Sequence, residues 1–319
     1  MNTHVLTGLD AQNPLGFFAA LGLLRVLDAH AAAAGGPRPM LGYGNGDTCA
    51  LLTCSGTLDD VIGIVLEDAV AQKAAAFLQI AYDTAGALTS SEHPDAKRDL
   101  KPSPAAARTI LERAAATGSR RDQDLLTGLF SELVTDNNGN TKPTSLHFTA
   151  GKQVFLAMVE DLRAGVTADD LREALLGPWK NESTLPSLSW DASVSRQYAL
   201  RASDPSADKK GSVAGANWLA VHGLAFFPVQ VARDRLVTTA TRGGWKDSVF
   251  TWPVWNVQLT APTIASLLRA SEPDPDHGRR WSAQERAAMG IEAVFWSKIL
   301  RSDQGGYGSF TPAAVVLPR

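Results

Sequence analysis

The fold is decided by the stretch Leu188-Ser-Trp-Asp-Ala-Ser-Val-Ser-Arg-Gln-Tyr-Ala-Leu-Arg201, followed after a polar span by Gly215-Ala-Asn-Trp-Leu-Ala-Val-His-Gly-Leu-Ala-Phe-Phe-Pro-Val229. The second part, Gly215 to Phe227, is apolar on every side, which is typical of a buried helix. The first part is strand-like, and it leads into a polar loop, Asp204 to Gly211. The stretch therefore predicts a buried helical anchor that carries a basic, exposed arm.

A second apolar helix is predicted near the amino terminus. Asn13 is a suitable N-cap, Pro14 suits the first helical position, and Gly35-Gly36-Pro37 ends the helix. Its apolar character around the whole circumference predicts a central position, and Gly22 predicts close packing against a neighbour. No unbroken apolar run reaches the roughly 18 residues of a membrane span, and Met1 to Thr7 lacks a signal-type core. We therefore expect a cytoplasmic protein with no membrane partner.

The remaining patterns indicate an α+β fold that is helix-rich, with one or two small antiparallel sheets. Helices are predicted at 59–80, 104–117, 120–134, 151–164, 167–176, 263–271 and 282–289, and strands at 40–45, 50–55, 229–238, 248–252 and 293–300. Residues 1–178 form a helix-rich part with a small N-terminal hairpin. Residues 179–319 form a mixed part that contains all eight tryptophans. We expect the two parts to share one core, because the apolar helix of the first part needs cover from the second.

Catalytic and metal-binding motifs are not found in the sequence. It has no P-loop, no adjacent His-Asp nuclease pair, no metalloprotease helix motif and no nucleophile elbow. Cys49 and Cys54 match no zinc pattern and are expected to be packed thiols of a strand. His222 is expected to be a satisfied core histidine. We accordingly predict no cofactor, no metal and no catalytic residue.

Charge and aromatic residues are concentrated after Trp179. From Trp179 to Trp255 there are nine Lys or Arg against six Asp or Glu, although the whole chain has a formal charge of -3. Basic groups interleaved with aromatics suit a groove that tracks a nucleic-acid backbone, or alternatively an ordinary core edge with a solvated face. The first interpretation predicts a nucleic-acid-binding set consisting of Lys180, Arg196, Arg201, Lys209, Lys210, Arg242, Trp245, Lys246, Arg279 and Arg280.

Three regions of the sequence resemble a known family. They are Gly8-Leu-Asp10 with Asn13-Pro-Leu-Gly-Phe-Phe-Ala-Ala-Leu-Gly22, then Ser189 to Leu224, and finally Phe250-Thr-Trp-Pro-Val-Trp255. Together they resemble proteins of type I-G (formerly I-U) CRISPR-Cas loci, of the Csb or large-subunit-like group or the helicase-extension group. The resemblance implies a non-catalytic subunit of an antiviral interference complex that assists crRNA-guided recognition of target DNA. Other effector subunits, crRNA and target DNA are the implied partners. This chain departs from the usual large subunit in being short and mildly acidic.

Two other functions are compatible with the sequence. The same Trp and Arg residues can anchor a protein interface, as in a scaffold or a recruiter of the helicase-nuclease. An uncharacterised enzyme is the third possibility, in which Asp191, Arg196 and Tyr198 move protons.

Overall fold

The computed structural model describes residues 1–44, 46–193, 211–270, 281–302 and 306–316. Its helices are α1 (Pro14–Ala34), α2 (Leu58–Ala71), α3 (Pro104–Ala116), α4 (Arg120–Leu129), α5 (Phe155–Gly165), α6 (Ala168–Leu176), α7 (Ala214–Gly223), α8 (Ala261–Arg269) and α9 (Ala283–Ala288), with 3-10 turns η1 (Gln72–Ala74) and η3 (Leu224–Phe226). Its strands are β1 (Asn2–Asp10), β2 (Met40–Tyr43), β3 (Cys49–Cys54), β4 (Phe130–Thr135), β5 (Thr141–Pro143), β6 (Val229–Ala232), β7 (Arg235–Thr238), β8 (Thr241–Arg242), β9 (Ser248–Trp255), β10 (Ile291–Arg301), β11 (Gly308–Phe310) and β12 (Ala314–Val315). All strand pairs are antiparallel, and the predicted helix-rich α+β fold is confirmed.

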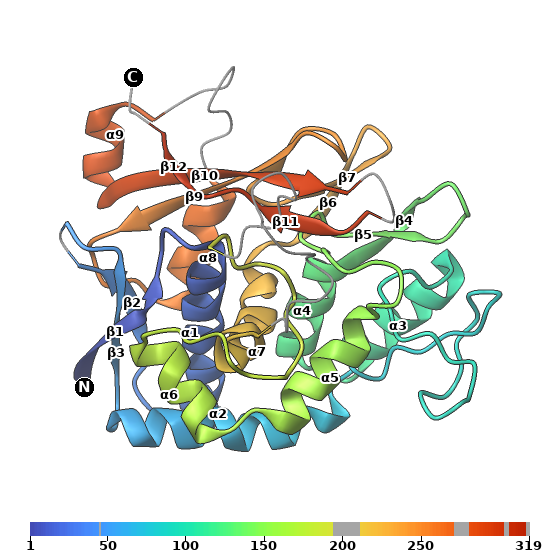
Figure 1. Cartoon of the computed structure of the whole chain (residues 1–319), viewed down its shortest axis with the longest axis horizontal. Helices are drawn as coiled ribbons and strands as arrows, with labels where there is room; N and C mark the ends of the chain where they lie inside the picture. The colour runs from blue at the N-terminus through green and yellow to red at the C-terminus, as the bar shows by residue number, and fades with distance from the viewer. Residues whose placement is uncertain (45, 194–210, 271–280, 303–305, 317–319) are drawn as a thin grey trace, which may run out of the picture.

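Helices α1 and α7 form the centre of the molecule (Figure 1). Among the described elements they have the most extensive contact between two helices. Their backbones touch at two glycines: a Cβ atom at Gly22 would lie 1.7 Å from the carbonyl oxygen of Leu219, and one at Gly223 would lie 2.2 Å from that of Phe18. No larger residue fits at either crossing point, as expected for close helix packing. The predicted buried helix and the close packing at Gly22 are thus confirmed.

Other elements enclose this helix pair on several sides. The sheet β11-β10-β9-β8, with β12 beside β10, lies above it in Figure 1, α2 crosses below it, and the sheet β1-β3-β2 lies to the left. Phe17 of α1 packs between the two sheets, since its ring lies 6.4 Å from Tyr43 and 6.0 Å from Trp252. Phe18 lies 5.1 Å from Phe250. The aromatic side chains of three distant segments therefore form one layer of the core.

The length and composition of α1 would also suit a membrane span. It has 21 residues, and its most apolar window has a mean hydropathy of 1.4, although it contains no unbroken apolar run of the length expected for a membrane span. The sequence-based expectation required an unbroken apolar run, whereas hydropathy averages over Arg25 and Asp28. In the structure, the helix is buried from Pro14 to Leu24 and contacts α2, α7, α8 and both larger sheets or their edges. It serves as the core helix of this fold.

Several predicted element boundaries are corrected by the structure. The helix expected over 59–80 ends at Ala71 and continues as a 3-10 turn, and the helix expected over 120–134 ends at Leu129 and becomes β4. The strand expected over 229–238 is a hairpin whose turn residues, Arg233 and Asp234, have φ of 49° and 62°. The described residues contain four sheets instead of one or two, and the N-terminal hairpin gains β1 as a third strand. The strand β1 was missed because its pairing partner, β3, is distant in the sequence.

Candidate functional site

The ten residues predicted to bind nucleic acid fall into two sets. Six lie outside the described residues, namely Arg196, Arg201, Lys209, Lys210, Arg279 and Arg280. Of the remaining four, Lys180 is exposed and follows α6, where its backbone N–H donates to Glu173. Arg242 ends β8, Trp245 and Lys246 lie on the turn that follows it before β9, and 40% of Trp245 is exposed. The structure thus brings three of the four described residues to one turn.

This β8–β9 turn is held by a residue that the sequence analysis missed. The guanidinium carbon of Arg301, at the end of β10, lies 4.0 Å from the centroid of the Trp245 ring and 5.0 Å from that of Phe148. The guanidinium donates hydrogen bonds of 2.6 Å to the carbonyl oxygens of Ser145 and His147. Burial lowers the pKa of Arg301 to about 10, so it remains a cation at neutral pH. Arg301 covers one side of the indole and leaves the rest partly open to solvent.

The segment that Arg301 contacts is itself fixed by a hydrogen bond between His147 and Asp99. His147 is 2% exposed, and its Nε2 lies 2.9 Å from Oδ1 of Asp99 and 3.0 Å from the hydroxyl of Thr149. Burial raises the pKa of Asp99, but the hydrogen bond with His147, the hydrogen bond from the backbone N–H of Leu100 and the charge of Lys101 together hold the pKa below its ordinary value. Arg301, which stacks on Trp245, and the segment around His147 that Arg301 contacts are therefore both held in place by hydrogen bonds.

A second polar cluster lies at the start of α1, where two of the resembling segments meet. The side-chain oxygen of Asn13 accepts the backbone N–H of Leu15 at 3.1 Å and so caps the helix. Its amide nitrogen donates to Oδ1 of Asp191 at 2.7 Å, and that oxygen also accepts from the backbone and hydroxyl of Ser193. Asp191 is 7% exposed, and its Oδ2 has no hydrogen bond from the part of the chain that the structure describes. This cluster joins residues 178 positions apart and fixes the point where the 188–201 stretch begins.

The expected exposure of the 190–201 segment is corrected at its described end. Trp190 is fully buried, and its indole N–H donates to the carbonyl oxygen of Leu146 at 2.9 Å, while Asp191 is also buried. Trp218, Trp252 and Trp255 are fully buried too. For these four, the core interpretation of the tryptophans is correct and the stacking interpretation is wrong. Their indole rings need the apolar cover that only a folded core supplies.

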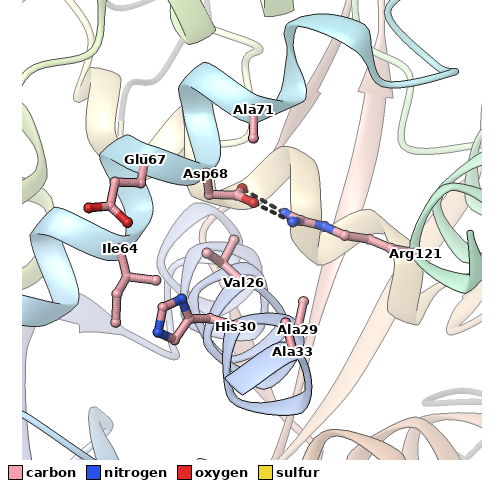
Figure 2. A pocket seen from close by; sticks show the side chains of 9 residues that line it. All are labelled: Val26, Ala29, His30, Ala33, Ile64, Glu67, Asp68, Ala71 and Arg121. Atoms are coloured by element: carbon pink, nitrogen blue, oxygen red, sulfur yellow. Dashed lines mark hydrogen bonds and ion pairs between the residues drawn. The ribbon is translucent and has the colours of Figure 1, made fainter. Parts of the chain in front are cut away.

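A cleft between α1 and α2 has a volume of about 280 Å³. Figure 2 shows Val26, Ala29 and Ala33 of α1 facing Ile64 and Ala71 of α2. The remaining lining residues are polar: His30, Glu67, Asp68 and Arg121.

Arg121, from α4, forms a two-armed ion pair with Asp68 at one end of the cleft. Behind this pair lies His222 of α7, which is 1% exposed, and its Nδ1 is 3.4 Å from a nitrogen of Arg121. Its Nε2 makes no hydrogen bond with the described residues and lies 3.9 Å from Asp68, so within that part of the chain the expected core histidine is only partly satisfied. Burial, aided by the charges of Arg121 and Arg25, lowers its pKa well below the ordinary value.

Metal-binding and thiol chemistry find little support in the described residues. Within those ranges, no three His, Cys, Asp or Glu side chains lie close enough together to hold a metal ion. Cys49 and Cys54 are free thiols of β3, as expected, and burial is the main reason why the pKa of Cys49 is raised to about 11.

No family model matches the sequence, and no curated protein or solved structure matches it.

Proposed function

We propose that this protein is a non-catalytic subunit of a type I-G-like CRISPR-Cas interference complex in the cytoplasm, where it assists crRNA-guided recognition of target DNA. The proposal rests on the sequence resemblance and on one structural observation, the β8–β9 turn. That turn presents Arg242, Trp245 and Lys246 on an otherwise mildly acidic protein. It supplies an aromatic surface and nearby cations, which are the groups that bind single-stranded nucleic acid without reading its sequence.

The support under Trp245 favours a binding role. A stacking surface must keep its orientation when no base is present, because an ordering cost subtracts from affinity. Arg301 holds the indole from one side and is itself fixed by two carbonyl oxygens. The indole is thus pre-oriented on the folded part of the molecule.

The test measures the affinity of the assembled complex for target DNA at about 100 mM salt. Trp245→Ala is expected to lower affinity roughly 5- to 100-fold, since one stacked base contributes on the order of 1–3 kcal/mol. The double variant Arg242→Ala with Lys246→Ala is expected to weaken binding and to reduce the salt slope by about one to two.

The matched control is Arg108→Ala with Arg113→Ala, which removes two exposed cations from α3 and changes the net charge equally. If the control and the β8–β9 variants lower affinity equally, the turn has no special role. If the complex binds target DNA equally well without this protein, the proposal fails.

A scaffold or recruiter of the helicase-nuclease is the second candidate function. Leu133 of β4 is 66% exposed, and the β4–β5 hairpin lies beside the β6–β7 hairpin, where Val231 is 40% exposed (Figure 1). Exposed apolar residues on adjacent hairpins suit a protein contact. Co-purification with the other effector proteins, together with unchanged DNA affinity in the β8–β9 variants, favours this function.

The enzyme hypothesis receives the least support. Oδ1 of Asp191 is already engaged by Asn13 and Ser193, which gives this carboxylate a structural role. Arg196 and Tyr198 lie outside the described residues. A Tyr198→Phe variant with full biological activity removes the basis of this hypothesis.

A further inference from the structure

The cleft between α1 and α2 is apolar along its walls and small in volume. Its alanine, valine and isoleucine walls enclose about 280 Å³. A dry cavity of roughly 150 Å³ already accepts benzene, whereas pockets for drug-sized ligands start at about 300 Å³. The cleft therefore fits one bulky side chain and is too small for a nucleotide.

The electrostatics of the cleft favour a positive charge at its rim. Glu67 is exposed and makes no hydrogen bond or ion pair with the described residues, whereas Asp68 is neutralised by Arg121. α1 carries no basic residue in its last turn, whereas Arg163 of α5 donates to the carbonyl oxygen of Ala69 near the end of α2, so the charge at the rim comes from the Glu67 carboxylate. Lys73 follows α2 but does not line the cleft.

The geometry points to a partner site: we propose that this cleft binds a protein segment that inserts an apolar side chain between α1 and α2 and places a lysine or arginine against Glu67. Val70 does not line the cleft, but it is 74% exposed and lies three residues after Glu67, so the two are neighbours on the surface of α2. A partner helix can thus contact the cleft and its rim with residues one turn apart.

The identity of the partner rests on the proposed function, because the other effector subunits are the proteins available to it. The chemistry of the cleft does not depend on that function. Two experiments therefore separate the two questions, one with small probes and the full-length protein alone, and one with the assembled subunits.

The first experiment is an NMR titration with 2-phenylethylammonium and with 2-phenylacetate, which carry the same phenyl ring but opposite charges. The cation is expected to shift the backbone amides of residues 26–33 and 64–71 and to bind at least about fivefold more tightly than the anion. Glu67→Gln should weaken the cation about fivefold or more, and Ala33→Leu should abolish binding by filling the cleft. Glu112→Gln, on exposed α3, is the matched control and should change nothing. Equal affinity for both probes, or shifts elsewhere only, would overturn the proposed chemistry.

The second experiment places a photo-crosslinking phenylalanine at Val70, with Val5 of β1 as an exposed control position. In the assembled complex, Val70 is expected to cross-link to another subunit at a peptide with an apolar residue and a Lys or Arg one helical turn apart. Glu67→Lys should lower the yield about tenfold, and reversing the partner's cation to Glu should restore it. Cross-links to a second copy of this chain, to a peptide without a cation, or to nothing would each overturn the assignment to a partner subunit. The probe titration uses this protein alone, so its result stays readable if the proposed function fails.

Discussion

His222 shows how burial decides the role of a single side chain in this protein. It is packed against Trp218 at a ring distance of 4.6 Å and is close to two arginines, Arg25 and Arg121. Asp68 is the acidic group nearest to it, at 3.9 Å. An imidazolium would lose its hydration there and face two like charges, so the folded state holds this histidine neutral.

This environment predicts a loss of stability on acidification. Because the pKa of His222 is lower in the folded state than in the unfolded state, the folded protein binds fewer protons. The stability that comes from keeping His222 neutral is fully present above the unfolded pKa of about 6.5. As the pH falls below that value, this contribution to the free energy of unfolding is lost by at most about 1.4 kcal/mol per pH unit. Urea unfolding at pH 7, 6 and 5 should show this slope in the wild type and a smaller slope in His222→Phe. The exposed His93→Gln serves as control, and equal slopes in all three proteins would contradict the prediction.

Asn13 is a second residue whose role depends on its partner. An aspartate is as good an N-cap as asparagine, so capping alone predicts that Asn13→Asp is neutral. The amide of Asn13, however, donates to Asp191, and a carboxylate would instead repel it at 2.7 Å. We expect Asn13→Asp and Asn13→Ala each to lower the free energy of unfolding by about 1–3 kcal/mol. Asn138→Ala, in an exposed turn, should have little effect; a neutral Asn13→Asp variant would show that the contact with Asp191 is not stabilising.

At the scale of elements, the α1–α7 pair depends on the absence of side chains at two positions. Gly22 and Gly223 bring the backbones together, and this allows the surrounding aromatic residues to close around both helices. The cost of glycine in a helix, about 1 kcal/mol relative to alanine, is offset by this packing.

Two glycine variants test that interpretation. Gly22→Ala should destabilise the protein by about 3 kcal/mol or more, because its methyl group would overlap the Leu219 carbonyl. Gly63→Ala, in α2, has nothing within 4 Å of the added Cβ and should leave stability unchanged or raise it by up to about 1 kcal/mol. Thermal unfolding followed by circular dichroism distinguishes the outcomes. Similar melting temperatures for the two variants would mean that α1 and α7 can separate without cost.

At the scale of the whole molecule, the C-terminal strands are tied to the N-terminal part by tryptophan side chains. The indole N–H of Trp252 donates to Ala11 at 2.8 Å, and that of Trp255 donates to Leu41 at 2.9 Å. One continuous cluster of buried residues includes members from Leu6 to Phe310. A boundary near residue 178 would therefore cut through the core.

This arrangement predicts that the chain unfolds as one unit. Fragments 1–178 and 179–319, expressed separately, should each remain unfolded or aggregate, because each loses the apolar cover that the other provides. Full-length protein should show a single calorimetric transition. A folded, monomeric fragment with a cooperative transition of its own would contradict the prediction and would establish two domains.

The sequence by itself determined the elements with strong local signals. Asn13, Pro14 and Gly35 define the ends of α1, and the Thr167–Asp170 capping box defines the start of α6, because caps act within one turn of the chain. The buried character of α1 and α7 also follows from composition alone.

Only the tertiary structure decided which tryptophans are core and which is exposed, and which residues meet. Trp190 and Trp245 both lie among polar residues in the sequence, yet one is fully buried and the other is 40% exposed. The Arg301–Trp245 stack, the Asn13–Asp191 bond and the cleft of α1 and α2 join residues tens to hundreds of positions apart. The physical reason is that such contacts form only when distant segments pack together, and no local pattern of residues encodes that meeting.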